Sequence, residues 1–120
     1  MKPEEREKER RRQQACERLG AASPACVICS EDDPHCLEQH HIAGRHCGDT
    51  VVPVCRNCHR KLSNAQKDHP TSVSDPTLLE RIGRFLLGLG DLFDLLTDRL
   101  HELGRLLISL AHREADLAGV

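Results

Sequence analysis

The stretch Cys26–His59, CVICSEDDPHCLEQHHIAGRHCGDTVVPVCRNCH, decides the fold of this 120-residue chain. Two C-x-x-C pairs bracket a pair of adjacent histidines, and a further histidine follows the last cysteine directly. Two thiolates three positions apart can grip one tetrahedral ion if the backbone folds tightly between them. The spacing therefore predicts a closed, structural Zn²⁺ site with four thiolate ligands, namely Cys26, Cys29, Cys55 and Cys58.

Composition favours a metal over a large core as the source of stability. A segment of about 50 residues buries too little surface to fold without a metal or crosslinks. The chain has no Trp or Tyr, and its two Phe residues, Phe85 and Phe93, lie outside the cysteine-rich segment, where we therefore expect no aromatic core. Residues 1–13 carry no apolar run for export, so we expect a reducing, cytoplasmic setting for the thiolates.

Three of the seven cysteines remain outside the two pairs: Cys16, Cys36 and Cys47. Free thiols are expected for them, although Cys36 or Cys47 could replace a ligand of the zinc site. The 25 residues between the two pairs exceed the simplest zinc-ribbon spacing, and the excess is the length that a hairpin needs.

The pattern predicts one compact domain, residues 21–68. The tight turn around each C-x-x-C pair is called a knuckle, and the expected order of elements is knuckle, hairpin, knuckle and helix. Its strands are expected over residues 37–42 and 51–54, joined across 43–50, because apolar and β-branched residues gather there between turn signals. A helix of about two turns is expected over 59–67, before Pro70.

Helical segments flank the compact domain on both sides. Residues 1–20 are rich in helix formers and pair Glu with Lys or Arg four positions later, which predicts a charged, solvated helical arm. A sharper interpretation places Arg10–Arg12 of this arm on a phosphate backbone. After a linker at 69–77, residues 78–117 are predicted to form one long amphipathic helix.

The long helix carries a heptad seam of the coiled-coil type, with apolar residues at alternating spacings of 3 and 4. The seam consists of Leu79, Ile82, Leu86, Leu89, Phe93, Leu96, Leu100, Leu103, Leu107 and Leu110. Small residues repeat every seven positions along one flank and would let another helix approach closely. These are Gly83, Gly90, Thr97, Gly104 and Ala111.

We expect a homo-oligomer or a partner protein to cover the 79–110 seam, because a helix of roughly 60 Å is too long to pack wholly on a 50-residue domain. A helical hairpin bent near Gly88–Gly90 and binding to a membrane surface are the alternatives. Charged residues interrupt the apolar run at helical spacing, which argues against a transmembrane span.

The adjacent histidines of the stretch predict a second, chemical site. Neighbouring side chains on a strand point to opposite faces, so His40 and His41 are not expected to bind the same ion. One of them is expected to bind metal, while the other acts as a base toward water or is held by a backbone carbonyl. His59, at a helix start beside a knuckle cysteine, could return toward the hairpin.

The stretch resembles the HNH endonuclease family, which has a ββα-metal fold. The matching segments are Cys26–Cys29 (CVIC), Leu37–Arg45 (LEQHHIAGR) and Val52–His59 (VPVCRNCH), within residues 24–67. The resemblance implies an α+β chain in which a small, zinc-stapled ββα-metal domain precedes the long helix. It also implies DNA as the substrate and Mg²⁺ or another divalent metal as the catalytic ion.

Each of three histidines matches a position of the family's motif. His40 stands at the first metal-ligand position, His41 at the general base and His59 at the final ligand of the catalytic ion. The family's middle Asn, which orients the base, has no counterpart before the second knuckle. Asp49 or Thr50 could take its role through a hydrogen bond, or His46 could become a third ligand.

A metal-dependent endonuclease that hydrolyses DNA phosphodiester bonds is the function that this resemblance implies. Four basic residues beside the motif could hold the phosphate backbone. They are Arg45, Arg56, Arg60 and Lys61. One alternative is a non-catalytic zinc adaptor for nucleic acid or protein, which would not need the three histidines. In another, the long helix is the functional core and the zinc domain is its cap, so that the helix alone would assemble. The formal net charge of −2 argues against binding nucleic acid through bulk charge alone.

Overall fold

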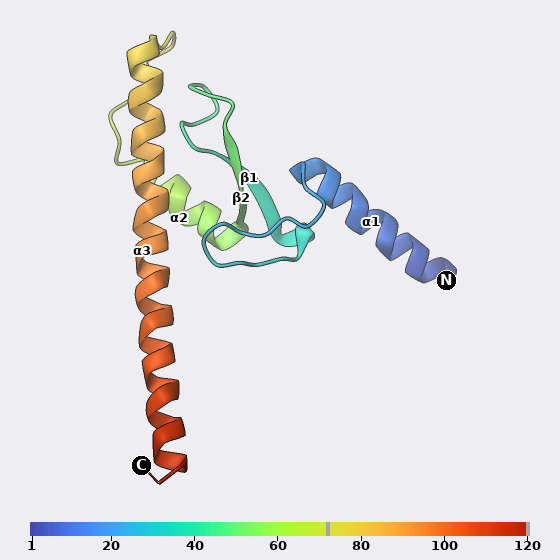
Figure 1. Cartoon of the computed structure of the whole chain (residues 1–120). Helices are drawn as coiled ribbons and strands as arrows, with labels where there is room; N and C mark the ends of the chain where they lie inside the picture. The colour runs from blue at the N-terminus through green and yellow to red at the C-terminus, as the bar shows by residue number, and fades with distance from the viewer. Residues whose placement is uncertain (72, 120) are drawn as a thin grey trace.

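The computed structural model describes residues 1–71 and 73–119 and has an α+β architecture (Figure 1). Helices flank a two-stranded antiparallel sheet, as the sequence predicts. The elements in chain order are α1 (Pro3–Leu19), the one-turn 3-10 helix η1 (Pro34–Cys36), β1 (Leu37–His41), β2 (Val51–Cys55), α2 (Arg56–Gln66) and α3 (Leu78–Leu117). The predicted linker includes Ser72, which lies outside the described residues.

The β1–β2 hairpin brings the histidine pair and the second knuckle to opposite ends of one ladder. Leu37 pairs with Cys55 at one end, and His41 pairs with Val51 at the other. The Ile42 amide donates to the Thr50 carbonyl at 3.1 Å, just beyond the last pair. The predicted strands therefore differ from the observed ones by a single residue at their C-terminal ends.

Helix α2 begins three residues earlier than the predicted helix over 59–67. Cys55 occupies its N-cap, where the sulfur accepts a hydrogen bond from the Cys58 amide at 3.4 Å. A side chain that satisfies one of the first helical N–H groups fixes the start of a helix. The cysteine that was predicted as a metal ligand is thus also the cap that starts α2.

The core lies between the hairpin, α2 and one face of α3. Its most completely buried side chains are Leu37, Val54 and Leu62, from β1, β2 and α2. Leu19 joins this cluster from the end of α1, and Leu92 joins it from α3. Both flanking helices therefore contribute to the core of the compact domain.

Helix α1 is an exposed arm for most of its length and is anchored only at its C-terminal end (Figure 1). There the Arg18 guanidinium donates to the Pro34 and Leu37 carbonyls at 3.3 and 3.0 Å. The Gln39 side chain donates back to the Arg18 carbonyl at 3.2 Å. Gly20, with φ of 73°, ends the helix in the left-handed conformation that favours glycine.

Helix α3 is continuous from Leu78 to Leu117, so the alternative of a hairpin bent near Gly88–Gly90 is wrong. At Gly88 its backbone lies so close to the Ile42 carbonyl that a side chain would collide with it. Leu92, 5% exposed, packs one turn further along, and Phe85 packs against the same core. No aromatic residue is among the buried core residues that the structure describes, as expected for the cysteine-rich segment, and Phe85 packs against them from α3 as a partly buried side chain.

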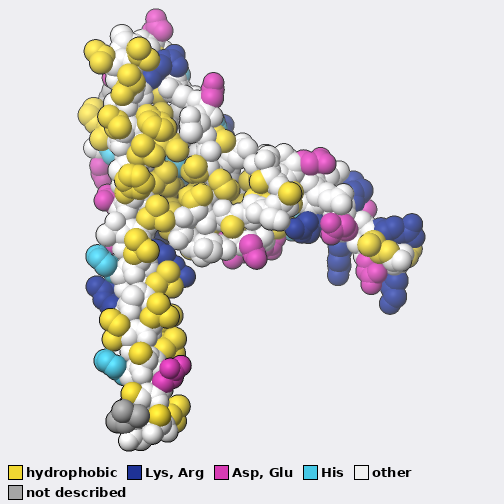
Figure 2. Space-filling view, viewed as in Figure 1, with side chains coloured by type: hydrophobic (Ala, Val, Ile, Leu, Met, Phe, Trp, Pro, Cys, Tyr) yellow, Lys and Arg dark blue, Asp and Glu magenta, His cyan; other side chains and the backbone are white. Residues whose placement is uncertain are grey.

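Beyond this contact, α3 presents an uncovered apolar surface (Figure 2). Eight of the ten seam residues are exposed, and the other two, Leu89 and Leu96, are partly buried against the core. Every side chain from His101 to Ala111 is exposed. Among the residues that the structure describes, no helix combines the length and apolarity needed to cross a bilayer.

Candidate metal centre and histidine pocket

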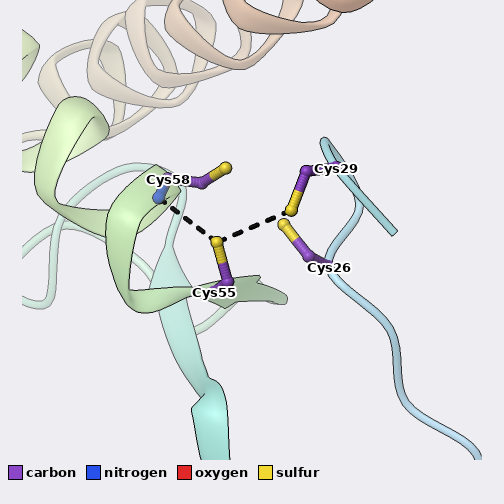
Figure 3. Close-up of side chains that lie close together, drawn as sticks. All are labelled: Cys26, Cys29, Cys55 and Cys58. Atoms are coloured by element: carbon purple, nitrogen blue, oxygen red, sulfur yellow. Dashed lines mark hydrogen bonds between the residues drawn. The ribbon is translucent and has the colours of Figure 1, made fainter. Parts of the chain in front are cut away.

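Four cysteine sulfurs converge between the first knuckle and the start of α2 (Figure 3). The ligand atoms of Cys26, Cys29, Cys55 and Cys58 all lie within 4.8 Å of one another, and the sulfurs of Cys29 and Cys55 are 3.6 Å apart. A tetrahedral Zn²⁺ with Zn–S bonds of about 2.3 Å sets its sulfurs about 3.8 Å apart. The cluster therefore has the donor set and size to hold a structural metal ion such as zinc.

The first knuckle is held by backbone hydrogen bonds around its two cysteines. The Ser30 amide donates to the Cys26 carbonyl at 3.0 Å, and the Cys26 amide donates to the Glu31 carbonyl at 2.8 Å. Ser30 adopts φ of 67°, a left-handed conformation that closes the turn. The Val27 amide donates to the Pro53 carbonyl at 3.1 Å, so the first knuckle is bonded to β2. The same strand ends at Cys55, the first cysteine of the second knuckle.

The protein environment shifts the pKa values of Cys26, Cys29 and Cys58 in different directions. Burial disfavours the Cys26 thiolate, but hydrogen bonds from the backbone of Cys29, Cys55 and Ile28 outweigh it and lower the pKa of Cys26 to about 7. Burial, together with the neighbouring thiols, raises the pKa of Cys58 and of Cys29. Metal binding must therefore displace protons from thiols that hold them firmly, so acid weakens it.

The remaining cysteines lie outside this cluster. Cys16 and Cys47 are buried, and Cys36 is exposed. Cys36 donates weakly to Asp33 at 3.7 Å and lies with Glu31 and Asp33 in a second group of potential ligands. Exposed acidic groups of this kind are common on protein surfaces, and the substitution of Cys36 or Cys47 into the four-cysteine cluster is not observed among the described residues.

The three motif histidines border one pocket of about 230 Å³ between β1 and α2. Its lining consists of Gln39, His40, His41, Gly44, Arg45, His59, Ser63 and Gln66. The rings of His40 and His59 meet edge to face with their centroids 5.3 Å apart. His41, the last residue of β1, borders this pocket as well, and it remains paired with Val51 in the ladder.

His40 is the most buried of these histidines, with 2% of its surface exposed. Burial, with smaller contributions from His59 and His41, lowers the pKa of His40 to about 4, while Asp91 of α3 opposes the shift. His40 is therefore a neutral imidazole at physiological pH. The neutral ring, with one unprotonated nitrogen, is the form that can bind a metal ion.

His59 is held by Glu38, a residue for which the sequence pattern predicts no role. Its Nδ1 lies 2.6 Å from Oε2 of Glu38, which projects from β1. Arg56 Nε lies 3.5 Å from the other oxygen of the same carboxylate. Glu38 occurs in the segment LEQHH that carried the family resemblance, but its partner on α2 depends on how the helix packs against the strand.

A second histidine–carboxylate pair joins the end of the domain to α3. His69 Nε2 lies 2.7 Å from Asp91 Oδ2, and both side chains are largely buried. No spacing rule connects these residues, which stand 22 positions apart. The pair therefore holds α3 against the domain. Its carboxylate, Asp91, is also the group that opposes the lowering of the His40 pKa.

Asp49, Thr50 and His46, which were expected beside the histidines from the family resemblance, do not line the histidine pocket. Asp49 and Thr50 are exposed and are not among the described residues that line the pocket. His46 Nε2 lies 2.9 Å from the Ser74 carbonyl, so this ring contacts the linker rather than the other histidines. The structure thus unites His40, His41 and His59 and leaves the other three residues outside the pocket.

The four basic candidates occupy different surroundings. Arg45 lines the histidine pocket, and Arg56 lies beside Glu38 at the start of α2. Arg60 and Lys61 are exposed on α2. Only Arg45 is therefore placed to contact a group inside the pocket.

Comparison of the chain with protein-family models, with curated proteins and with solved structures finds no match.

Proposed function

We propose that this chain is an HNH-type, metal-dependent endonuclease that hydrolyses DNA phosphodiester bonds in the cytoplasm. The observation that carries the proposal is the convergence of His40, His41 and His59 on one pocket beside the four-cysteine centre. A centre that only staples the fold would not need three histidines around a shared opening. The order of hairpin, knuckle and helix agrees with a ββα-metal unit.

In this proposal His40 and His59 hold the catalytic divalent ion, and His41 is the general base. The His40 and His59 rings meet edge to face with their centroids 5.3 Å apart, so these two side chains would supply the protein ligands of the ion. When bound, the ion polarises the scissile phosphate and stabilises the leaving 3′ oxygen. His41 accepts a proton from the attacking water, since a positioned imidazole is an effective base near neutral pH.

The basic residues position the substrate in this scheme. Arg45 contacts the phosphate in the pocket, while Arg56, Arg60 and Lys61 contact the backbone on either side. Such contacts to phosphate oxygens carry no base information, so the cleavage is expected to be weakly sequence-specific. The binding should weaken as salt is raised, because it depends on these few cations.

A zinc adaptor that binds nucleic acid or protein without cutting is the second candidate. The exposed positions of Asp49 and Thr50 favour it, because no residue of the middle segment reaches His41 to orient it. The adaptor would retain the four-cysteine centre and the basic surface of α2. It would bind DNA without any dependence on His41.

Plasmid cleavage separates the two candidates. The purified full chain is incubated with Mg²⁺, Mn²⁺ or Ni²⁺ beside the variant His41→Ala and the control His101→Ala, an exposed histidine of α3. Imidazole ligands suit Ni²⁺ better than Mg²⁺, so all three ions are needed. Cleavage by the parent and the control but not by His41→Ala supports the nuclease; no cleavage by zinc-loaded parent on any substrate supports the adaptor.

We also propose that another helix, from a second copy or a partner protein, covers the seam of α3. Leu100 and Leu107 are 68% and 64% exposed on the part of α3 beyond the domain. Replacing both by Asp should convert an oligomer to a monomer in sedimentation without changing the zinc content, whereas Ser109→Asp on the same helix should not. A parent chain that is already monomeric would contradict self-association and leave the partner protein.

A further inference from the structure

We infer that Glu38 is a positioning residue that fixes the tautomer and orientation of His59. The distance of 2.6 Å between Glu38 Oε2 and His59 Nδ1 is that of a short, charge-assisted hydrogen bond. β1 supplies the carboxylate and α2 supplies the imidazole, so the bond joins the two elements that border the histidine pocket. The tautomer of His59 is independent of the proposed function, whereas the effects on ion binding and on catalysis rest on it.

The bond determines which nitrogen of His59 is free. A carboxylate offers only acceptor atoms, so the proton in this hydrogen bond belongs to His59 Nδ1. A neutral imidazole carries one ring proton, and Nε2 therefore keeps its lone pair. That nitrogen is the one available to a metal ion in the pocket that His59 shares with His40.

The neighbours of the pair restrict both of its members. Arg56 Nε lies 3.5 Å from Glu38 Oε1, the oxygen that His59 does not use. The buried ring of His40 meets the His59 ring edge to face on the pocket side. The Arg56 side chain is largely exposed and contributes little by itself, so the short bond is the principal restraint on His59.

A carboxylate behind a metal-binding histidine performs a known physical task. It holds the ring in the orientation that presents the other nitrogen, and it makes that nitrogen more basic. Loss of such a partner typically lowers metal affinity or activity by about 10–100-fold. Glu38 should therefore matter for ion binding although it does not line the pocket with the histidines.

Nitrogen-15 NMR of the imidazole rings tests the tautomer on the full, zinc-loaded chain. The parent should show His59 protonated on Nδ1, Glu38→Ala should lose this preference, and Glu38→Gln should retain it, because the amide oxygen still accepts the bond. Glu102→Ala, which removes an exposed carboxylate of α3, is the control and should match the parent. Equal zinc content in all four proteins verifies that they are folded.

Mn²⁺ titration supplies a second readout. Glu38→Ala should bind about 10–100-fold more weakly than the parent, and Glu38→Gln should recover part of the affinity. A His59 that is protonated on Nε2 in the parent, or a tautomer and an affinity that Glu38→Ala leaves unchanged, would overturn the inference. If the tautomer changes as expected while no variant cuts DNA, the positioning role stands and the nuclease proposal fails.

Discussion

Replacing Gly88 by Ala tests how α3 is attached to the domain that carries the histidines. A Cβ built at Gly88 would lie 2.7 Å from the Ile42 carbonyl carbon and still closer to its oxygen. These are backbone atoms, next to His41, and they cannot rotate away as a side-chain end can. Either the strand end or the helix must move.

The expected effect is a net loss of stability. Overpacking typically costs about 1–3 kcal/mol, and a clash with backbone belongs at the upper end of that range. The higher helix propensity of alanine stabilises the folded state by about 1 kcal/mol relative to glycine and offsets part of this loss. The net loss of about 2 kcal/mol should lower Tm by roughly 10 °C, since 1 kcal/mol corresponds to about 4–8 °C in a domain of this size.

Gly90 provides a matched control on the same helix. A Cβ at Gly90 meets nothing within 4 Å, so Gly90→Ala should gain helix propensity and leave Tm unchanged or raise it by a few degrees. Thermal unfolding followed by circular dichroism gives both values, and amide exchange at Ile42 reports whether the contact has opened. Equal or higher stability of Gly88→Ala relative to Gly90→Ala would refute the close packing of α3 against Ile42.

Two further predictions concern the metal centre and the buried histidine. Cys29→Ser removes a ligand from the four-cysteine cluster, so the zinc content measured by elemental analysis should fall and the compact domain should unfold. The control Cys36→Ser lies outside the cluster and should bind as much zinc as the parent. Loss of zinc from Cys36→Ser would contradict the assignment of the ligands. His40 has a pKa of about 4 in the folded state, below its unfolded value of about 6.5. Between these values the unfolded state binds more protons than the folded state, so the free energy of unfolding decreases as the pH falls. From pH 7 to pH 5 this decrease is about 2 kcal/mol. Denaturant unfolding should show this dependence in the parent and a shallower one in His40→Gln at equal zinc content, and parallel curves would disprove it.

The sequence was sufficient for the local features that depend on short spacings. Two cysteines three positions apart can bind one ion only if the backbone between them forms a tight turn. The structure brings the four sulfurs together, as this spacing predicts. The strands are marked by apolar and β-branched residues between turn signals, and the long helix is marked by its heptad seam; both signals lie in short stretches of sequence. The predicted start of α2 differs from the observed start, because Cys55 occupies the N-cap and cysteine is not among the usual N-cap residues.

The histidine pocket could be predicted only in part. His40 and His41 are neighbours in sequence, but only the packing of α2 against β1 brings His59 to the same pocket. The place of Asp49 and Thr50 in the chain suggests a role beside His41, but both residues are exposed in the loop between β1 and β2. Loop conformation depends on tertiary contacts, such as that between His46 and the Ser74 carbonyl, which no local rule predicts.

The sequence by itself determined the donor set of the metal centre, the helical and extended segments, and the apolar seam of α3, because each rests on residue types at short, periodic separations. Only the tertiary structure decided that Gly88 and Leu92 dock α3 onto the domain, and that Glu38 and Asp91 hold His59 and His69. Those contacts join residues about 20 or more positions apart. They arise from the packing of helix against strand, and packing is a property of surfaces that the linear pattern does not specify.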